Sequence, residues 1–391
     1  MPNTFSSGPK TEKPRSDLRV TYTPGEETLT ITAESKTGVL FRSSIHEQAK
    51  EICDYFHVTT GDLTIADFGA VPFVIAARIE ATLEKAFPRL SGEYLPAMAA
   101  HAEYATRRDR LRRSRLYLPG NQPKLMLNAG IHKPDGLILD LEDSVAPDEK
   151  NDARFIVRNA LRVLDFMGAE RMVRINQGEQ GREDLSYIVP HNVHTILVPK
   201  VESGEEIKML DEEIAAIVKE SGRRTPVYLM PIIESARGVL NAQVIADASP
   251  NNIALAIGLE DYTADIGVRR TQDGKESFFA RSMIVNAARA AGIQAIDTVF
   301  SDVADEAGLR DSVREAKALG FDGKGCIHPR QIGPIHESFA PTREELEYAR
   351  RIVQAYEEAE AKGLGVVALG SKMIDPPVVK RALQTLKLVN S

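Results

Sequence analysis

The chain has two cysteines, no tryptophan and no long apolar run, and these shortages exclude several classes of protein. Cys53 and Cys326 lie far apart and outside any Cys-x-x-Cys spacing, so neither a disulfide framework nor a zinc site is indicated. No segment approaches the ~20 consecutive apolar residues of a membrane span, and the Pro/Ser/Lys-rich stretch 1–17 lacks the apolar region of a signal peptide. We therefore expect a cytoplasmic protein with no membrane partner.

An excess of basic residues is also missing. The 49 lysines and arginines are outnumbered by 56 aspartates and glutamates, and the net charge of −7 argues against a nucleic-acid partner. No GxSxG, P-loop or GxGxxG motif occurs in its required context, which excludes serine hydrolase, kinase and Rossmann classes. The length of 391 residues leaves room for one large domain and a smaller one.

Eight short apolar runs, separated by helix-like stretches, are the most informative feature that is present. A strand buried on both faces is almost wholly apolar and carries polar side chains only where it emerges, and nearly every run here ends on a charged or amide residue. Eight such units in a row predict a (β/α)8 TIM barrel with its chemistry at the C-terminal strand ends. The runs are residues 116–118, 137–139, 172–173, 196–198, 227–233, 253–259, 295–296 and 325–327.

The chain before the predicted barrel has the pattern of a small α+β domain. The Pro24-Gly25 turn is expected to join strands 18–22 and 28–32, and Ser44 with Glu47 is expected to cap a helix. A third strand at 63–65 and a second helix at 74–87 complete it. The predicted division is a flexible tail at 1–16, the α+β domain at 17–90, a linker at 91–110, the TIM barrel at 111–340, and C-terminal helices with a lid at 341–391.

Helix starts and a lid are predicted in the later part of the chain. Two capping boxes, Ser203 with Glu206 and Thr342 with Glu345, indicate where helices begin. Segment 368–377 follows the last strand and combines glycine, charge and a double proline, which suits a lid. The alternative is that the double proline simply begins the final helix.

An arginine-rich stretch leads into the first barrel strand. We expect Arg113, together with Lys124 beyond the strand, to contact a phosphorylated cofactor. The alternative is a charged linker that is merely solvated. The arginines of the stretch are Arg107, Arg108, Arg110, Arg112, Arg113 and Arg115.

Glu234 and Asp261 are the strongest catalytic candidates because they end the fifth and sixth runs. A barrel places these two ends side by side, and two such carboxylates can hold Mg2+ while leaving positions for water and substrate oxygens. The alternative is that one or both only hydrogen-bond to neighbouring strand ends. The sequence thus predicts a magnesium site at the barrel mouth.

Arg174 ends the third run and offers a guanidinium group for a carboxylate or a developing enolate oxygen. A salt bridge with Asp140 or Glu142 is the alternative role. We expect Asp140, Glu142 and Asp143 to surround the site and to hold metal-bound waters or Arg174. His328 is expected to be a structural hydrogen-bonding residue rather than a base.

The motifs at these strand ends resemble those of the citrate lyase β-subunit family from about residue 111 to the C-terminus. The family usually has Asp-Gly before Lys-Met-Ile-Asp, where this chain has Gly370-Ser371, a departure that concerns the lid and leaves Asp375 in place. The matching motifs are RSRLYLPGN at 113–121, LDLEDSVAP at 139–147, VRIN at 173–176, PKVES at 199–203, IIES at 232–235, GLEDYTADIG at 258–267, GFDGK at 320–324, IHP at 327–329 and KMID at 372–375.

This resemblance implies a TIM barrel in homotrimers or hexamers that uses Mg2+ to break or form a carbon–carbon bond between a 2-oxo acid and an acyl thioester. By matching motif positions, Glu234 and Asp261 are the metal ligands. Arg174 contacts the substrate and the thioester oxygen, with Glu142 beside it in the catalytic group. Asp375 is the lid acid, and we expect it to act in the site of a neighbouring subunit.

The N-terminal domain is similar to the acyl carrier γ-subunit of citrate lyase, through DFGA at 67–70 and IAARIE at 75–80. In that family a serine just before the first strand carries a phosphoribosyl-dephospho-CoA group, and Ser16 is the candidate here. The alternative is a domain that has lost this arm and serves in assembly or docking.

Together these features predict a Mg2+-dependent lyase that cleaves a 3-hydroxyacyl thioester of citryl-carrier or citryl-CoA type to oxaloacetate and an acetyl thioester. An acyl-transferase subunit is a further expected partner. The alternative within enzymes is a free-CoA lyase or synthase of malyl or citramalyl type with an unmodified N-terminal domain. The alternative outside enzymes is a non-catalytic assembly protein that uses the barrel as a scaffold.

Overall fold

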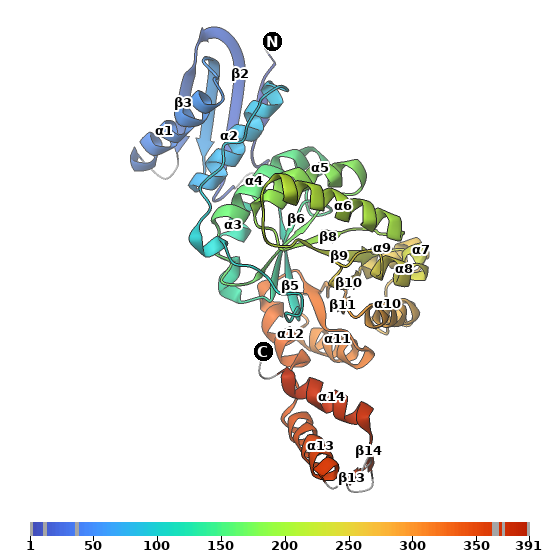
Figure 1. The fold of residues 1–391 in the computed structure, drawn as a ribbon. Helices are drawn as coiled ribbons and strands as arrows, with labels where there is room; N and C mark the ends of the chain where they lie inside the picture. Colours follow the sequence, from blue (N-terminus) through green and yellow to red (C-terminus); the bar gives the residue numbers. More distant parts are fainter. Residues whose placement is uncertain (1–2, 11–13, 36–38, 362–366, 370–371, 389–391) are drawn as a thin grey trace.

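A closed barrel of eight parallel strands forms the centre of the molecule (Figure 1). The computed structural model describes residues 3–10, 14–35, 39–361, 367–369 and 372–388. Each barrel strand pairs in parallel with the next, and the last pairs with the first, so the predicted TIM barrel is confirmed. The strands are β5 (Ser114–Pro119), β6 (Gly136–Asp140), β7 (Glu170–Arg174), β8 (Thr195–Val198), β9 (Tyr228–Ile233), β10 (Ala254–Ile257), β11 (Gln294–Asp297) and β12 (Gly323–Cys326).

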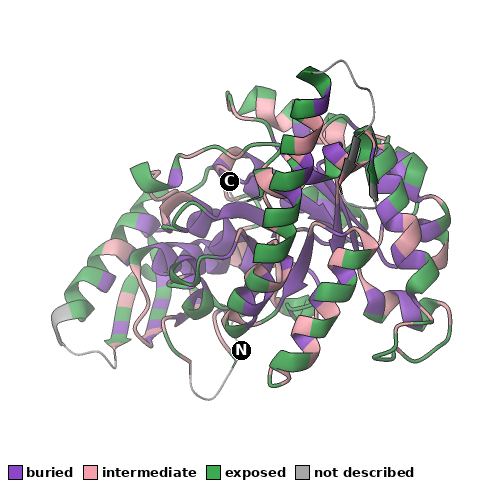
Figure 2. Ribbon diagram, turned by 90° about the horizontal axis from the view of Figure 1, so that it is seen from below, coloured by how far each residue is buried: buried purple, intermediate pink, exposed green. Residues whose placement is uncertain are grey.

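Helices surround the barrel and cover the outward face of its strands. On β6, Leu137 and Leu139 belong to the apolar layer under the helices, whereas Ile138 between them lies in a separate cluster inside the barrel. Figure 2 shows the strands almost wholly buried and the outer helix faces exposed. The helices are α3 (Pro123–Met126), α4 (Lys150–Val163), α5 (Gly178–Ile188), α6 (Gly204–Glu220), α7 (Ala236–Leu240), α8 (Ala242–Ala246), α9 (Leu259–Asp265), α10 (Phe278–Ala290), α11 (Glu306–Leu319) and α12 (Ile332–Phe339).

Short 3-10 turns and caps complete the barrel's connections. Ser203 accepts a hydrogen bond from the backbone N–H of Glu206 at 3.3 Å and so caps α6, as predicted. Within the described ranges, no helix combines the length and the apolar character needed to cross a bilayer. The 3-10 turns are Ala100–Ala102, Ala129–His132, Pro147–Glu149, Val189–His191 and Pro329–Gln331.

The N-terminal domain is a four-stranded sheet with two helices, but its strand order differs from the prediction. Segments 18–22 and 28–32 do not form a hairpin, because the sheet order is β1-β2-β4-β3 and β4 lies between them. β3 runs parallel to β4, and a parallel pair needs a crossover, which α1 supplies. The elements are β1 (Phe5–Ser7), β2 (Leu18–Thr28), β3 (Thr30–Ser35), α1 (Val39–Tyr55), β4 (Thr60–Asp67) and α2 (Pro72–Ala86).

Two further predictions for this domain were wrong. Residues 5–7, placed in the predicted flexible tail, form β1 and pair with β2. Ser44 does not begin a helix with Glu47, because it lies inside α1, where its hydroxyl donates to the backbone oxygen of Phe41 at 3.0 Å. A capping pattern inside a sequence that already favours helix marks no boundary by itself.

The N-terminal domain is fixed to the barrel through a buried ion pair between α2 and α4. The guanidinium group of Arg158, which is fully buried, donates to the Glu80 carboxylate, with 3.0 Å from Nη1 to Oε1. Asn159 on the same helix donates to the backbone oxygen of Phe73 at 3.1 Å. Burial raises the pKa of Glu80, and Arg158 opposes this shift. The two domains therefore share a buried contact in which the charge of Glu80 is compensated by Arg158.

Replacing Arg158 by alanine is expected to lower the free energy of unfolding by about 3–5 kcal/mol, because the buried Glu80 carboxylate then has no counterion. Urea unfolding followed by circular dichroism measures this change. The matched control is Arg182→Ala, which breaks an exposed pair with Glu213 and should cost about 1 kcal/mol or less. Equal effects of the two substitutions would contradict the role given to the buried pair.

The C-terminal segment forms an arm with an apolar core of its own. Figure 1 shows this arm extending away from the barrel beyond α11 and α12. Thr342 and Glu345 exchange the two hydrogen bonds of the predicted capping box, at 3.1 and 2.8 Å. The double proline begins α14, as the alternative to a lid proposed, and Gly370-Ser371 lie outside the described residues. The elements are α13 (Arg343–Ala361), β13 (Val367–Leu369), β14 (Lys372–Ile374) and α14 (Pro376–Lys387).

Candidate active site

A cavity of about 380 Å³ opens at the C-terminal ends of the barrel strands. Its lining includes Asp140, Arg174, Glu234 and Asp261, which come from four different strands or the turns that follow them. These side chains are separated by up to 121 positions in the sequence and meet because parallel strands all end at one face. The barrel thus brings together the metal and substrate candidates predicted from the strand ends.

Glu234 is the more deeply buried of the two metal candidates, at 6% exposed. It follows β9, and its Oε2 accepts a hydrogen bond from the backbone N–H of Lys200 at 2.9 Å. Gly258 makes room for it, since a Cβ atom there would lie 2.3 Å from Glu234 Oε1. Burial, with the nearby charges of Asp261 and Glu142, raises the pKa of Glu234 to about 8. Such a carboxylate requires a cation to remain ionised.

Asp261 stands beside it on α9 and is the more exposed partner, with 43% of its side chain accessible. Lys200 Nζ lies 3.3 Å from Asp261 Oδ1 and 3.7 Å from Glu142 Oε1. Burial lowers the pKa of Lys200, but Glu142, Asp143 and Asp261 outweigh it and raise the pKa overall. Lys200 therefore neutralises part of the negative charge at the mouth.

Arg174 forms salt bridges with Asp140 and Glu142, the alternative role considered for it in place of a substrate contact. Its Nε and Nη2 donate to the two oxygens of Asp140, both at 2.7 Å, while Nη1 lies 2.8 Å from Glu142 Oε2. The guanidinium also stacks on the ring of Tyr117, 5.2 Å from its centroid. Burial lowers the pKa of Arg174, and Asp140 more than reverses this effect. The side chain is a rigid, permanent cation facing the cavity.

The remaining acids hold these groups in place. Glu142 is 2% exposed and accepts a hydrogen bond from Gln177 at 2.7 Å. Burial raises the pKa of Glu142, and Arg174 opposes the rise. Asp140 accepts backbone hydrogen bonds from Glu142 and Ser144, and Arg174 holds its pKa low despite burial. This is the supporting arrangement predicted for Asp140 and Glu142.

The donor set fits a divalent cation. In the part of the chain that the structure describes, Glu234 forms no ion pair with a lysine, arginine or histidine side chain within 4 Å, although it is buried beside Asp261. The described residues contain no group of three or more His, Cys, Asp and Glu side chains placed to hold a metal. A cation between Glu234 and Asp261 would therefore complete its coordination with water and substrate oxygens, which is the pattern Mg2+ favours.

Several predicted site residues are not brought to this cavity. Arg113 precedes β5, at the opposite end of the barrel, and is paired with Asp135 at 3.0 Å, so a direct role for it at the mouth is wrong. Lys124 is exposed on α3, after the same strand, at the mouth end. Asp375 caps α14 in the C-terminal arm and does not line the cavity. Ser16 lies in the N-terminal domain, just before β2.

Several arginines of the arginine-rich stretch contact the barrel instead of being only solvated. Arg112 is fully buried and paired with Glu170, with 2.7 Å between Nε and Oε2. Arg108 and Arg110 donate to backbone oxygens of the barrel. Several of these arginines thus bind the linker to the N-terminal end of the barrel, because their long side chains satisfy strand and loop carbonyls there.

The structure also shows the positions of His328 and of two site residues, Lys200 and Tyr117, that were not predicted as such. His328 caps the turn Pro329–Gln331, in agreement with the structural role expected for it. Lys200 was included only as part of the PKVES motif at 199–203, and its role was not predicted. Tyr117 was missed because it lies within an apolar run, although strand alternation between Leu116 and Leu118 places it inside the barrel.

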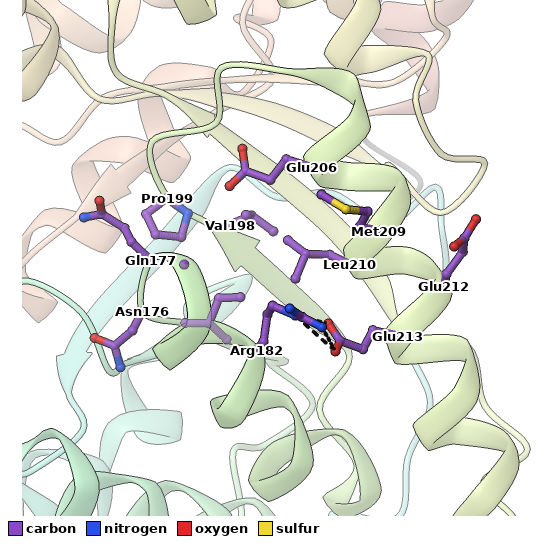
Figure 3. A pocket seen from close by; sticks show the side chains of 12 residues that line it. Asn176, Gln177, Arg182, Val198, Pro199, Glu206, Met209, Leu210, Glu212 and Glu213 are labelled. Carbon is purple, nitrogen blue, oxygen red and sulfur yellow. Dashed lines mark hydrogen bonds and ion pairs between the residues drawn. The ribbon is translucent and has the colours of Figure 1, made fainter.

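A larger cavity of about 500 Å³ lies between α5 and α6 (Figure 3). Its lining is mainly apolar, with Val198, Met209 and Leu210 among its side chains. Arg182 and Glu213 there are paired with each other at 2.8 Å, as the dashed lines in Figure 3 show. Size therefore does not locate the chemistry, which requires the carboxylates and the arginine of the smaller cavity.

A closed parallel barrel with carboxylates and an arginine at its C-terminal mouth defines a TIM-barrel enzyme. The family described as HpcH/HpaI aldolase/citrate lyase matches residues 113–329, and an acyl-carrier family described as malonate decarboxylase delta subunit (MdcD) matches residues 14–86. The chain belongs to the HpcH/HpaI aldolase/citrate lyase family. It is a carbon–carbon lyase with an acyl-carrier-like N-terminal domain, and the resemblance found in the sequence is confirmed.

Named relatives and solved structures agree with this assignment. Citrate lyase subunit beta of Leuconostoc mesenteroides subsp. cremoris is 42% identical over 286 residues, which are 72% of this chain and 95% of that protein. Human mitochondrial citramalyl-CoA lyase is 33% identical over 326 residues, covering 80% of this chain and 93% of the other. The crystal structure of CitE from Mycobacterium tuberculosis with magnesium, acetoacetate and coenzyme A has a TM-score of 0.62 and 32% identity, and covers 73% of this chain and 100% of its own.

Proposed function

We propose that this chain cleaves a citryl-type 3-hydroxyacyl thioester to oxaloacetate and an acetyl thioester, with Mg2+ as its cofactor. The observation that carries the proposal is the buried Glu234 carboxylate beside Asp261 and Arg174 in the barrel mouth. Support also comes from citrate lyase subunit beta relatives at 42% identity and from CitE crystals that contain magnesium.

Glu234 and Asp261 would hold Mg2+, which when bound stabilises negative charge on the substrate's hydroxyl and carboxylate oxygens. In cleavage a base accepts the proton of the substrate hydroxyl, the carbon–carbon bond breaks, and its electron pair leaves with the thioester fragment as an enolate. Arg174 stabilises the enolate oxygen, and the salt bridges to Asp140 and Glu142 keep its guanidinium in position. An acid then protonates the enolate carbon to give the acetyl thioester.

The acid in this proposal is Asp375 of a neighbouring subunit in a homotrimer or hexamer. In its own chain Asp375 is on the C-terminal arm, and Met373 beside it is 68% exposed. Leu383 of the same arm is 44% exposed. Exposed apolar side chains around a capping carboxylate are consistent with an arm that covers another copy's mouth.

The docked N-terminal domain is proposed to carry the thioester on Ser16. Ser16 has a positive φ of 54° and donates its N–H to Phe68 at 3.0 Å, so the turn before β2 is fixed. Next to it, buried Asp17 accepts two hydrogen bonds from Arg78, which also donates to the backbone oxygen of Asn121 after β5. This contact holds Ser16 toward the mouth end of the barrel, where a tethered substrate gains effective concentration.

Modification of Ser16 has a direct test in the intact mass of the chain purified from its native host. We expect the mass of phosphoribosyl-dephospho-CoA on the wild type, because Ser16 lies partly exposed in a fixed turn before β2, and its loss in Ser16→Ala. Ser44→Ala, within α1, is the matched control and should keep the added mass. An unmodified wild-type chain in cells that contain the modifying enzymes would favour the free-CoA alternative.

The reaction itself is tested by supplying citryl, citramalyl and malyl thioesters and measuring oxaloacetate, pyruvate or glyoxylate with coupled dehydrogenases. Oxaloacetate from a citryl thioester is the expected product. The citramalyl-CoA lyase relatives, at 33% to 35% identity, favour a free-CoA enzyme as the second candidate, for which pyruvate would be the product. Lack of cleavage of any of the three thioesters would favour the scaffold alternative.

The setting proposed for the enzyme follows its chemistry. Its substrates are small acyl thioesters, and we propose a cytoplasmic location without a nucleic-acid or membrane partner. An acyl-transferase subunit that loads the carrier arm is proposed as a partner in the Ser16-modified form. Lys124, exposed at the mouth end after β5, is the cation proposed to contact the phosphates of the cofactor.

A further inference from the structure

Arg115, an arginine inside the barrel, has no role in the proposed cleavage reaction. Arg115 is the inward residue of β5 one pleat below Tyr117, and it is 1% exposed. Its register partners on the adjacent strands are Gly136 and Gly325, so two residues without side chains flank it. A Cβ atom on Gly136 would lie 3.5 Å from Arg115 Cγ and 2.9 Å from Met172 Cε. The neighbouring strands thus leave space for a large side chain at this level.

The charge of Arg115 has no counterion in the described part of the chain. Nη1 donates to the sulfur of Met230 at 3.0 Å, and thioether sulfur is a weak acceptor. Nε is buried and has no hydrogen-bond partner there. Burial lowers the pKa of Arg115, as expected for a cation that lacks an acid.

Three other buried arginines of this protein donate to oxygen atoms. Arg112 pairs with Glu170, and Arg158 pairs with Glu80. Arg171 donates to the backbone oxygens of Leu161 and Leu164 at 2.7 and 2.8 Å. Removing an ion from water costs several kcal/mol unless an opposite charge compensates it. In the described part of the chain Arg115 has neither a carboxylate partner, as Arg112 and Arg158 have, nor carbonyl oxygens, as Arg171 has.

Arg115 also lines the cavity that contains the catalytic carboxylates. Tyr117 stands between it and Arg174, and its ring stacks on the Arg174 guanidinium. The lining also includes two small residues, Ala256 on β10 and Gly325 on β12, the strand beside β5. The cavity therefore has a cation at its mouth and a second, unpaired cation deeper in the barrel.

We propose that Arg115 binds a second carboxylate of the substrate and so selects thioesters whose 2-oxo acid product is a dicarboxylate. This inference rests on the proposed lyase function and defines its substrate class. A 3-hydroxyacyl thioester that yields a 2-oxo acid has a carboxylate on the carbon that bears its hydroxyl group, and this first carboxylate belongs with the metal ligands and Arg174. A carboxymethyl arm on the same carbon would extend a second carboxylate into the barrel, toward Arg115. A substrate with a methyl group or a hydrogen instead of the carboxymethyl arm would leave the buried guanidinium group of Arg115 unpaired. Such a substrate is expected to bind more weakly.

Binding of the two oxo acids isolates this contact, because oxaloacetate and pyruvate differ only by that carboxylate. Titration calorimetry with Mg2+ and freshly dissolved acid gives both dissociation constants without requiring turnover. We expect wild type to prefer oxaloacetate, and Arg115→Met to weaken oxaloacetate binding by about 30-fold or more while pyruvate binding changes little. Arg115→Lys, which keeps the charge but loses the planar fork, should lie between them.

Arg171→Met is the matched control, since it removes another fully buried arginine that does not line the cavity. It should lower the melting temperature and keep the preference for oxaloacetate. Arg115→Met should melt at or above the wild-type temperature without ligand, because it replaces an unpaired buried charge by an apolar side chain of similar size. A merely structural Arg115 would give the reverse, with lower stability and an unchanged preference.

The possible outcomes distinguish the role proposed for Arg115 from the lyase function proposed for the chain. Equal affinity of wild type for both acids, or an unchanged preference in Arg115→Met and Arg115→Lys, overturns the role of Arg115 and leaves the lyase function standing. Failure of wild type to bind either acid or to cleave any candidate thioester overturns the lyase proposal instead. Parallel cleavage assays with citryl and citramalyl thioesters should show the same loss of selectivity in Arg115→Met.

Discussion

Replacing Glu234 or Asp261 by alanine is expected to reduce lyase turnover by about a thousandfold or more, because each supplies one of the two protein carboxylates proposed for Mg2+. A single remaining carboxylate binds the cation too weakly to keep it at the substrate oxygens. Turnover is measured after chelation and stepwise return of Mg2+. Calorimetry without substrate should show weakened Mg2+ binding in both variants.

The fold should survive both substitutions. Glu234 is buried, and burial with the nearby charge of Asp261 raises its pKa to about 8, so alanine removes a carboxyl group that is costly to ionise in the apo protein. Glu260→Ala is the matched control, because Glu260 neighbours Asp261 on α9 but is 62% exposed and paired with Arg270. It should retain normal turnover. Near-wild-type activity of Glu234→Ala or Asp261→Ala after Mg2+ is returned would show that the metal assignment is wrong.

The barrel and much of its site could be predicted from the sequence because their determinants are local. A strand covered on both faces must be apolar until it emerges, so Glu234 and Arg174 stand out at the ends of their runs. Parallel strands then place all such ends at one mouth, whatever their separation along the chain. The same argument predicted that Asp140 and Glu142 would lie around Arg174, and the salt bridges have this arrangement.

Long-range pairing could not be predicted in this way. Nothing within residues 18–35 indicates that β4, some 30 residues later, would lie between β2 and β3, because strand order depends on which edges meet after α1 crosses the sheet. Arg113 was misplaced because an arginine before a strand has the same local pattern whether it binds a ligand or closes the far end of a barrel. Only its partner Asp135 decides between them.

Arg115 shows a further limit of local patterns. It interrupts an apolar strand, which an alternation argument treats as a defect, and only the register with Gly136 and Gly325 shows that the barrel has space for it. Tyr117 was missed for a related reason, since aromatic residues are common in buried strands and do not interrupt the apolar pattern. The function of an unusual residue inside a barrel strand can therefore be inferred only once its register partners on the adjacent strands are known.

Asp375 carries the other prediction with a large effect, because the arm that contains it has an apolar core separate from that of the barrel. Ile374, Val379 and Ala382 pack with residues of α13 in this separate cluster. The Asp375 carboxylate accepts a hydrogen bond from the N–H of Val378 at 3.2 Å, so it is held at the start of α14, where the helix dipole stabilises its charge. The arm thus presents a fixed acid that is not part of its own barrel's cavity.

Asp375→Asn and Arg174→Ala are each expected to be nearly inactive, and mixing them should restore activity. If each site combines the barrel of one subunit with the arm of another, random exchange at equal amounts makes about one quarter of the sites fully wild type. The mixture should therefore recover about a quarter of wild-type turnover, measured after subunit exchange has been verified by mass spectrometry of the assembled oligomer. Mixing Arg174→Ala with Glu234→Ala is the control, since both defects lie in the barrel and no exchange of arms can join an intact Arg174 to an intact Glu234. Verified exchange without recovered activity would mean that Asp375 acts within its own chain or has no part in the reaction.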